Sequence, residues 1–242
     1  MPDDIHRLVV RALRRSFGPI EAVRDASFEV SRGEVVGLLG PNGAGKSTIL
    51  DCLAGLLPAD GGEVFVDGVP LAAEERHRAM FYLPDSLVPW RDERAGDVVD
   101  VFADLWNVDA RTRDAWARGA AVALGVEELQ RRPIGELSKG QRKRLLLSLA
   151  LLVPRPLVLM DEPFDGLDLR QVRQTIALLR QTAREGRSLL LSIHAMRDAE
   201  RSCDRLVLVS DGRTGARGSL GALRAQAGLP AGELEDVFLA LT

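Results

Sequence analysis

Residues 34–48 read EVVGLLGPNGAGKST, and this stretch decides the fold of the chain. The apolar run 34–39 predicts a buried strand, and residues 46–57 predict a helix that Pro58 ends. The loop between them matches the pattern G-x-x-x-x-G-K-[ST], in which glycines let backbone N–H groups converge on phosphate oxygens. The N-terminus of the following helix adds a positive dipole at the same place. The stretch therefore predicts a phosphate-binding loop between a buried strand and a helix.

Two side chains of this loop and two carboxylates further along the chain carry the expected chemistry. Lys46 would reach the β- and γ-phosphates, and the Ser47 hydroxyl would ligate Mg²⁺. Residues 157–162 read LVLMDE, an apolar strand that ends in Asp161 and Glu162. Asp161 can hold Mg²⁺, and Glu162 can act as a general base toward an attacking water. The alternative, an acidic pair at the surface, is disfavoured because the same chain carries the phosphate loop.

The rest of the chain alternates short apolar strands with helical patterns. A turn at 17–19 joins the first two strands, and from 94 to 154 only helical spacing is found. The segment 169–185 reads as a helix, and the tail 220–242 as two short helices split at 228–230. This alternation predicts an α/β fold with a mainly parallel sheet, crossover helices and an inserted helical lobe. Further strands are predicted at 8–14, 26–30, 63–67, 79–83, 157–160, 189–193 and 206–209.

Composition excludes several classes of protein. The 242 residues are 46% hydrophobic and carry a net charge of −3, so the chain offers no basic field for nucleic acid. Residues 1–15 lack the apolar core of a secretory signal, and the apolar stretch 145–160 is interrupted and too short to span a bilayer. Cys52 and Cys203 have no metal-ligand spacing and predict core thiols in a reducing compartment. We therefore expect a cytosolic protein that needs a partner chain for work at a membrane. Nearly all of the positive charge is Arg, and the lysines are Lys46, Lys139 and Lys143.

Further motifs narrow the class. Residues 137–141 read LSKGQ and resemble the LSGGQ signature of the ABC ATPases, which precedes an apolar helix. Residues 161–163 are similar to the end of that family's Walker B motif, and residues 166–168 are similar to its D-loop. His194 stands where the family has its switch histidine, and Phe17 stands where an aromatic ring stacks on adenine. The sequence contains no N-K-x-D motif for reading guanine, which excludes a GTPase.

The resemblance implies a P-loop NTPase core with a mainly parallel sheet, an N-terminal antiparallel β-subdomain and an inserted α-helical subdomain. It covers nearly the whole chain, which we expect to be a single ABC ATPase domain, 1–242. The expected parts are the β-subdomain with the first half of the core (1–93), the helical subdomain with the signature (94–154), the second half of the core (155–215) and a short C-terminal helical tail (216–242).

The resemblance also implies ATP and Mg²⁺ as ligands, bound between two head-to-tail protomers. Glu162 and His194 are the implied catalytic pair, with His194 contacting the γ-phosphate and positioning the water. The signature acts on ATP bound to the partner protomer, from a helix N-terminus that is itself an anion site, and Asp168 pairs across the dimer. The implied signature residues are Ser138, Lys139, Gly140 and Gln141. The implied ATP contacts are Phe17, Gly40, Pro41, Asn42, Gly43, Ala44, Gly45, Lys46, Ser47 and Thr48. The implied Mg²⁺ ligands are Ser47, Asp161 and Asp85.

Several of these roles have a structural alternative. Ser138 followed by Gln141 is also a capping-box pattern, and both roles can hold together because the cap exposes the N–H groups. Asp168 is also a candidate N-cap for the helix that follows it. A lone histidine at a strand end is often structural, but the order of the motifs favours the catalytic role for His194. Phe17 has a core position as its alternative; the family more often has Tyr there, and Phe keeps the stacking ring.

Asp85 departs from the family pattern. After the strand 79–83 the family usually places Gln, which touches Mg²⁺ or the attacking water, whereas here the segment 83–85 reads LPD. A carboxylate is a good ligand for a hard cation, but without a close metal it would repel the γ-phosphate. Either Asp85 does the work of the Gln with altered geometry, or the loop is displaced and turnover is slow. We favour the first interpretation because the other chemistry-bearing residues are present.

The resemblance further implies a dimer that closes when ATP binds and opens after hydrolysis. This movement must be transmitted to a partner protein. The expected docking surface is the helical lobe together with residues 86–90, where Val88 and Trp90 would meet an integral-membrane permease. For Trp90 the alternative is that it covers local core. The signature region, residues 162–165 and residues 234–239 resemble ATP-binding subunits paired with ABC-2-type export permeases.

We therefore expect the ATPase of a membrane exporter, located on the cytoplasmic face of the cell membrane through its permease. The second protomer is expected to be a copy of the same chain, with a different ABC chain left open, and no nucleic acid is expected as a partner. The alternative is a single-domain ABC ATPase that serves a soluble machine such as iron–sulfur cluster assembly.

Overall fold

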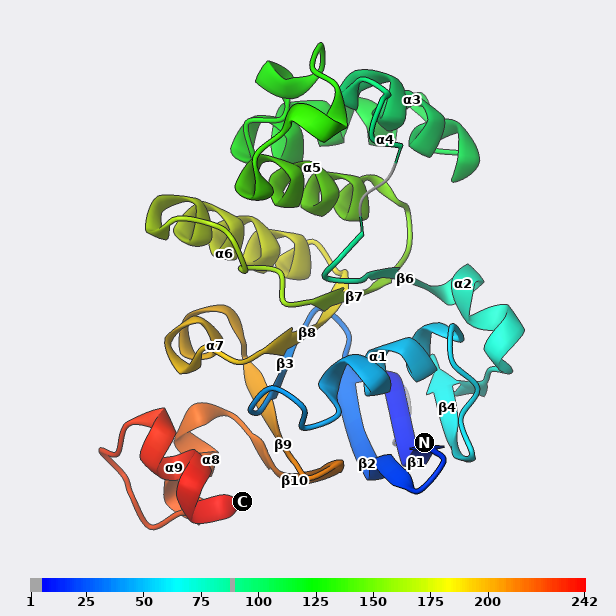
Figure 1. Cartoon of the computed structure of the whole chain (residues 1–242). Coiled ribbons are helices and arrows are strands. Elements are labelled where there is room, and N and C mark those ends of the chain that lie inside the picture. The colour runs from blue at the N-terminus through cyan, green and yellow to red at the C-terminus, as the bar shows by residue number, and fades with distance from the viewer. Residues whose placement is uncertain (1–5, 88–89) are drawn as a thin grey trace.

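The computed structural model describes residues 6–87 and 90–242, which form a ten-stranded sheet with helices packed around it (Figure 1). Across the sheet the strands follow the order β5-β4-β1-β2-β10-β9-β3-β8-β7-β6. The strands are β1 (His6–Phe17), β2 (Ile20–Ser31), β3 (Val35–Leu39), β4 (Gly61–Val66), β5 (Val69–Pro70), β6 (Met80–Leu83), β7 (Leu157–Asp161), β8 (Ser188–Ile193), β9 (Arg205–Ser210) and β10 (Arg213–Gly218). The α-helices are α1 (Lys46–Ala54), α2 (Arg76–Ala79), α3 (Ala95–Leu105), α4 (Ala110–Trp116), α5 (Lys139–Leu152), α6 (Leu169–Arg184), α7 (Met196–Ser202), α8 (Leu220–Gln226) and α9 (Leu234–Leu241).

The sheet has an antiparallel half and a mainly parallel half. β1 pairs antiparallel with β2 and with β4, and β5 extends this half. In the other half β6, β7, β8, β3 and β9 run parallel to one another. β10 joins the two, because it pairs antiparallel with β9 and lies parallel to β2, with Arg213 opposite Asp25. The predicted α/β fold, with a mainly parallel sheet and an N-terminal antiparallel β-subdomain, is confirmed.

The central strands are covered on both faces. Every residue of β3, β7 and β8 is buried, as expected for parallel strands with helices above and below them. Along β3, Val36 and Leu38 pack in one apolar cluster with α1 and the antiparallel strands, whereas Val35 and Leu39 pack in a second cluster with α6 and α7. This alternation fixes α1 on one side of the sheet and the later helices on the other (Figure 1).

α1 ends earlier than the sequence predicts. The expected helix 46–57 stops at Ala54, and Gly55 follows in the left-handed conformation with φ +77°. Its N–H group bonds to the carbonyls of Asp51 and Cys52, which closes the last turn. The glycine therefore terminates the helix before Pro58 can.

The inserted α-helical subdomain is also confirmed. It contains α3, α4 and α5, with a π-helical turn at Ala117–Ala121 and 3₁₀ turns at Glu127–Leu129 and Ile134–Glu136. Trp116 is buried and donates from its indole Nε1 to the carbonyl of Ser148 at 2.7 Å, which ties α4 to α5. Phe81 of β6 makes edge-on contacts with Phe102 and Trp106, at centroid distances of 6.0 and 5.4 Å. These contacts fasten the lobe to the edge of the sheet.

The C-terminal tail folds back on the core. Its two helices, α8 and α9, are separated at the predicted break, and Leu223, Val237 and Phe238 are buried in the cluster that contains α7. β10 was not predicted from the sequence: it reads RTGARG and only its last residue is buried. Within residues 6–87 and 90–242, none of the helices has the length and apolarity needed to cross a bilayer.

Candidate functional site

The candidate site lies where three neighbouring parallel strands end. The phosphate loop follows β3, Glu162 follows β7, and His194 follows β8. Because the carboxyl ends of parallel strands meet at one edge of the sheet, these segments converge there. In the loop, Gly45 adopts φ +101°, and a Cβ atom on it would clash with the carbonyl oxygen of Ala22. Only glycine fits at this position, where the chain turns into α1.

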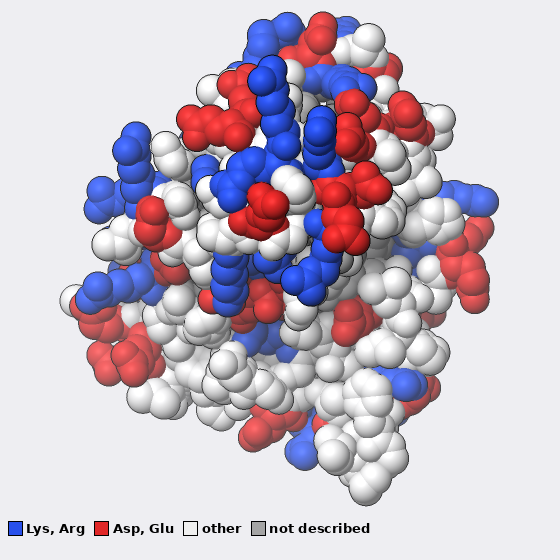
Figure 2. Space-filling view, turned by 45° about the horizontal axis from the view of Figure 1, so that its top comes forward, with Lys and Arg blue, Asp and Glu red and all other residues white. Residues whose placement is uncertain are grey.

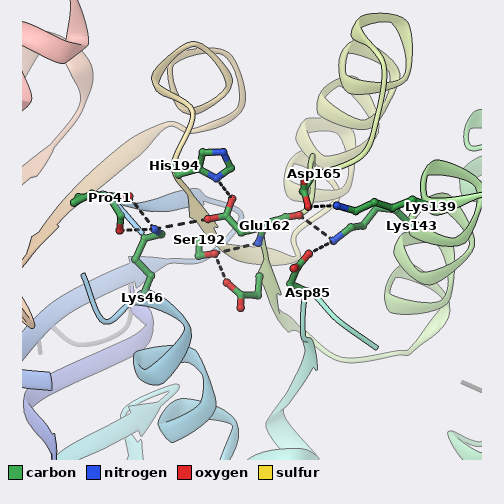
Figure 3. A network of polar contacts seen from close by, with 11 residues as sticks. Pro41, Lys46, Asp85, Lys139, Lys143, Glu162, Asp165, Ser192 and His194 are labelled. Atoms are coloured by element: carbon green, nitrogen blue, oxygen red, sulfur yellow. Dashed lines mark hydrogen bonds and ion pairs between the residues drawn. The ribbon is translucent and has the colours of Figure 1, made fainter. Parts of the chain in front are cut away.

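Lys46 lies folded into the loop that precedes it. Its side chain is 5% exposed, and its ammonium donates to the carbonyl oxygens of Gly40 and Pro41 at 2.8 and 3.1 Å. Glu162 Oε1 is 3.7 Å from the same nitrogen (Figure 3). Burial lowers the pKa of Lys46, and the nearby carboxylates of Glu162 and Asp161 oppose that shift. The ammonium therefore stands next to both the loop and the candidate general base.

Glu162 is held at both its backbone and its side chain. It has φ +46°, an unusual conformation for a residue with a side chain. Its N–H group donates to Ser192 Oγ at 3.0 Å, and the Ser192 hydroxyl in turn donates to the Asp161 carboxylate. Glu162 Oε2 lies 2.7 Å from His194 Nδ1 (Figure 3). The predicted catalytic residues Glu162 and His194 are thus in direct contact.

The predicted phosphate and metal residues line a common cavity of about 340 Å³. Lys46, Ser47 and Asp161 lie together there. A Mg²⁺ ion bound to nucleotide phosphates needs one or two protein oxygens, here those of Ser47 and Asp161, because phosphate and water supply its other ligands. Lys46 would supply the positive charge for the phosphates. Over residues 6–87 and 90–242 there is no cluster of three His, Cys, Asp or Glu side chains able to hold a metal alone. The lining residues are Ala22, Asn42, Gly43, Gly45, Lys46, Ser47, Thr48, Asp85, Asp161 and Glu162.

The remaining loop residues lie beside this cavity. Gly40 and Pro41 contribute the carbonyls that bind Lys46. Ala44 is 5% exposed and packs in the apolar cluster behind the loop. Phe17, at the end of β1, is 44% exposed, and the Arg15 guanidinium lies over its ring at 4.8 Å from the centroid. The core alternative for Phe17 is therefore wrong, because a large part of its side chain is exposed to solvent.

The signature segment caps α5. Ser138 Oγ accepts from the N–H of Gln141 at 3.2 Å, and Gln141 Oε1 accepts from the N–H of Ser138 at 3.0 Å, so the predicted capping box is confirmed. Lys139 Nζ binds Asp165 Oδ2 at 2.7 Å. This bond raises the pKa of Lys139 and lowers the pKa of Asp165. A Cβ atom on Gly140 would stand 2.8 Å from the carbonyl oxygen of Gly166, so the signature lies directly against the predicted D-loop of its own chain.

Asp168 is the N-cap of α6, as the structural alternative predicted. Its Oδ1 accepts from the N–H groups of Arg170 and Gln171, each at 2.9 Å. Gln171 Oε1 in turn accepts from the N–H of Asp168 at 3.2 Å, which completes a second capping box. This bonding accounts for Asp168 within one protomer and leaves its role across a dimer as a prediction.

Asp85 lines the phosphate cavity, as expected, and has a partner that the sequence did not suggest. Lys143 Nζ lies 2.8 Å from Asp85 Oδ1 and 3.0 Å from the carbonyl oxygen of Glu162 (Figure 3). All three lysines of this arginine-rich chain, Lys46, Lys139 and Lys143, therefore bind residues at or beside the site. That rarity was the one signal in the sequence that could have drawn attention to Lys143.

The predicted docking segment is exposed where the structure describes it. Trp90 is 51% exposed and Leu87 is 37% exposed, so Trp90 does not serve as local core. Val88 lies outside the described residues. A second cavity, of about 450 Å³, opens beside this segment against α5. It is lined by Asp85, Ser86, Leu87, Lys139, Arg142, Lys143 and Leu146.

Charge is mixed on the face of the molecule that carries the helical lobe. Figure 2 shows acidic and basic side chains interspersed there, without a broad area of one sign. This distribution agrees with the net charge of −3 and offers no continuous basic track for a nucleic-acid backbone on that face.

A phosphate loop at a helix N-terminus, with an acidic pair ending a neighbouring parallel strand, defines a nucleotide-binding P-loop protein. The comparison with known families makes this specific. Residues 23–165 match the family described as ABC transporter. The chain belongs to the ABC transporter family.

Individual relatives agree with this assignment. A Nod factor export ATP-binding protein I of Burkholderia lata is 35% identical over 217 residues, which are 88% of this chain and 71% of that protein. The ABC-type transporter ATP-binding protein EcsA of Bacillus subtilis is 28% identical over 237 residues, 97% of this chain and 96% of that protein. A solved ATP-binding subunit of an ABC transporter is 28% identical, with a TM-score of 0.86 over 96% of this chain and 98% of that one. The chain is thus similar along nearly its full length to ATP-binding proteins of transporters.

Proposed function

We propose that this chain is the ATP-hydrolysing subunit of a membrane exporter and works as a dimer. The observation that carries the proposal is the contact of Glu162 with both Lys46 and His194 at the edge of the phosphate cavity. This arrangement places a cation for phosphate, a carboxylate base and an orienting imidazole within one small space. It supports hydrolysis as well as nucleotide binding.

ATP binding would begin at the loop. Backbone N–H groups within residues 42–47 and the N-terminus of α1 provide the anion site. The Lys46 ammonium would exchange its carbonyl partners for the β- and γ-phosphates, a favourable exchange because the new partners are charged. Ser47 and Asp161 would hold Mg²⁺ with phosphate oxygens, and Asp85 lines the same cavity. When bound, the metal neutralises charge on the phosphates.

Glu162 and His194 would have separate roles in hydrolysis. The Glu162 carboxylate would accept a proton from the attacking water, as a general base close to the γ-phosphate. His194 Nδ1 binds the same carboxylate at 2.7 Å, so it would orient the base, and in this proposal it would also contact the γ-phosphate. Ser192 fixes the Asp161–Glu162 pair from the adjacent strand. The two carboxylates therefore differ in role: Asp161 for the metal and Glu162 for the water.

The signature would act on the partner's nucleotide. Ser138 and the N–H groups near Gly140 stand at the N-terminus of α5, which is a favourable place for the γ-phosphate of ATP bound to a second protomer. Lys139 and Gln141 belong to the same segment, and Asp168 would meet the partner across the interface. ATP would then join two protomers, and hydrolysis would release them.

The exposed side chains of Leu87 and Trp90 would transmit this motion to a membrane subunit. Exposed apolar side chains beside a cavity are typical of a protein contact surface. Export is favoured because relatives of this chain are named as Nod factor export proteins. A bacterial Atm1-family ABC exporter with ATP bound is 25% identical, with a TM-score of 0.80 over 94% of this chain and 41% of that one. The protein would therefore reside on the cytoplasmic face of the membrane, held by a permease.

Two measurements test the proposal. The purified chain should hydrolyse ATP with Mg²⁺, and Glu162→Gln should remove nearly all of that activity while ATP still binds. The tagged chain, extracted from membranes of its native cell in mild detergent, should carry a polytopic membrane protein in nearly one-to-one ratio. Recovery in the soluble fraction only, with soluble partners, would contradict the exporter and favour a soluble machine.

A further inference from the structure

We infer that Lys143 is a positioning residue for hydrolysis: its ammonium ties the helix that carries the signature to the backbone of Glu162 and to Asp85. The inference rests on the proposed ATPase activity and adds to it a residue that does not touch nucleotide. Lys143 would act by fixing where the Glu162 carboxylate stands.

The geometry of Lys143 is that of a buried cross-link. The side chain comes from the second turn of α5 and is 5% exposed. Its ammonium has two partners on two other segments, Asp85 Oδ1 at 2.8 Å and the carbonyl oxygen of Glu162 at 3.0 Å (Figure 3). A buried ammonium requires such partners, because leaving it unpaired is costly. One side chain thus connects the helical lobe, the end of β7 and the segment after β6.

The conformation of Glu162 explains why this bond matters. Residues with side chains rarely adopt φ +46°, and such backbone persists only where the surroundings impose it. The peptide on one side of Glu162 is held by the bond from its N–H to Ser192, and the peptide on the other side by the bond from Lys143 to its carbonyl. Without Lys143 this carbonyl keeps the bond from the N–H of Asp165 at 3.2 Å, within its own turn, but loses its tie to α5. The carboxylate would then lose the position that places it beside His194 and the cavity.

The same bond links the signature to the general base within one protomer. Ser138 caps α5, and Lys143 lies on the following turn of that helix. If the signature shifts toward the partner's nucleotide, the Lys143 ammonium moves with the helix. The carbonyl of Glu162, which is bonded to that ammonium, would move as well. Closure of the dimer would therefore also align the Glu162 carboxylate for hydrolysis.

Three variants separate this role from general stability. Lys143→Met keeps the length of the apolar stem and removes the donor. Lys143→Gln keeps an N–H donor on a shorter side chain. Arg144→Met is the matched control, because Arg144 is half-buried on the same helix and donates to the carbonyl of Leu124, inside the lobe and away from Glu162. Thermal melting of each variant checks that the chain is folded.

The readouts are kcat and KM for ATP with Mg²⁺, and the Kd for a fluorescent ATP analogue. Lys143→Met should lower kcat at least tenfold, and its Kd should stay within about twofold of wild type because the phosphate loop is untouched. Lys143→Gln should recover part of the lost kcat, and Arg144→Met should keep kcat within about twofold of wild type. A merely structural role would lower the melting temperature and leave kcat per folded molecule unchanged.

The outcomes distinguish this inference from the proposed function. A wild-type chain that hydrolyses ATP, with Lys143→Met as active as wild type, would overturn the positioning role alone. An equal loss of kcat in Lys143→Met and Arg144→Met would also overturn it, because the effect would then belong to the lobe as a whole. A wild-type chain without ATPase activity would overturn the proposed function, and this inference with it.

Discussion

Arg187 joins the helical lobe to the sheet, and its replacement should cost a large part of the stability. It stands just before β8, and its guanidinium donates to four backbone carbonyls at the end of α5 and in the segment that follows. These acceptors are Leu151 at 2.8 Å, Val153 at 2.9 Å, Arg155 at 3.0 Å and Ala150 at 3.3 Å. Burial lowers the pKa of Arg187 to about 10, so the group remains a cation at neutral pH. A cation at the C-terminus of a helix also opposes the negative end of its dipole.

The size of the effect follows from these bonds. Arg187→Met keeps an apolar stem of similar volume and removes every donor. A hydrogen bond from a charged group contributes about 1.5–3 kcal/mol. Part of the lost stability is offset, because the variant no longer has to remove a charged group from water when it folds. Some of the freed carbonyls can reach water, since Arg187 and Leu151 line a surface cavity of about 510 Å³. We expect a net loss of about 3 kcal/mol in the free energy of unfolding.

Urea unfolding followed by circular dichroism measures this loss as a lower midpoint at an unchanged slope. Arg184→Met is the control, because Arg184 is an exposed arginine at the end of α6, and its loss should stay within about 0.5 kcal/mol. A loss below about 1 kcal/mol for Arg187→Met would refute the reasoning, because it would mean that the carbonyls at the end of α5 do not depend on the guanidinium.

Three further predictions concern single side chains. Phe17→Ala should raise the Kd for ATP about tenfold, as expected for losing one base–aromatic stack, whereas Phe17→Tyr should bind as wild type; equal affinity of all three would remove Phe17 from the adenine site. Burial raises the pKa of the Cys52 thiol to about 11 and that of Cys203 to about 12. Both thiols should therefore react slowly with iodoacetamide at pH 8 in the folded protein and rapidly after denaturation, and mass spectrometry showing fast native labelling would contradict this burial. Asp168→Ala should lose about 1 kcal/mol of stability through the α6 cap and Asp168→Asn much less; identical urea midpoints for the two variants would argue against the capping role.

The phosphate loop could be predicted from the sequence because its chemistry is local. The glycines, Lys46 and Ser47 are contiguous, and the buried strand and the helix on either side are encoded in the same stretch. The capping boxes at Ser138 and Asp168 are local as well, since each needs only a residue three positions further on. The pairing of Glu162 with His194 as catalytic residues was implied by the family resemblance, through the order of the motifs.

The features that were missed depend on contacts distant in sequence or on weak local signals. β10 reads RTGARG, with almost no β-branched or aromatic residues, and its place is fixed by β9 and β2. The bonds of Lys143 join residues from α5, β7 and the segment after β6, which no periodicity connects. α1 ended early because Gly55 offered a left-handed cap before Pro58 was reached.

The state of assembly with ATP tests the central claim most directly. Glu162→Gln should bind ATP and Mg²⁺ without hydrolysing them, so the closed dimer should accumulate. Light scattering on this variant should give the 26.3 kDa mass of the single chain without nucleotide and twice that mass with saturating ATP and Mg²⁺. The double variant Lys46→Ala with Glu162→Gln is the control and should stay monomeric, because its phosphate site is lost. A Glu162→Gln variant that binds ATP and remains monomeric would contradict the account.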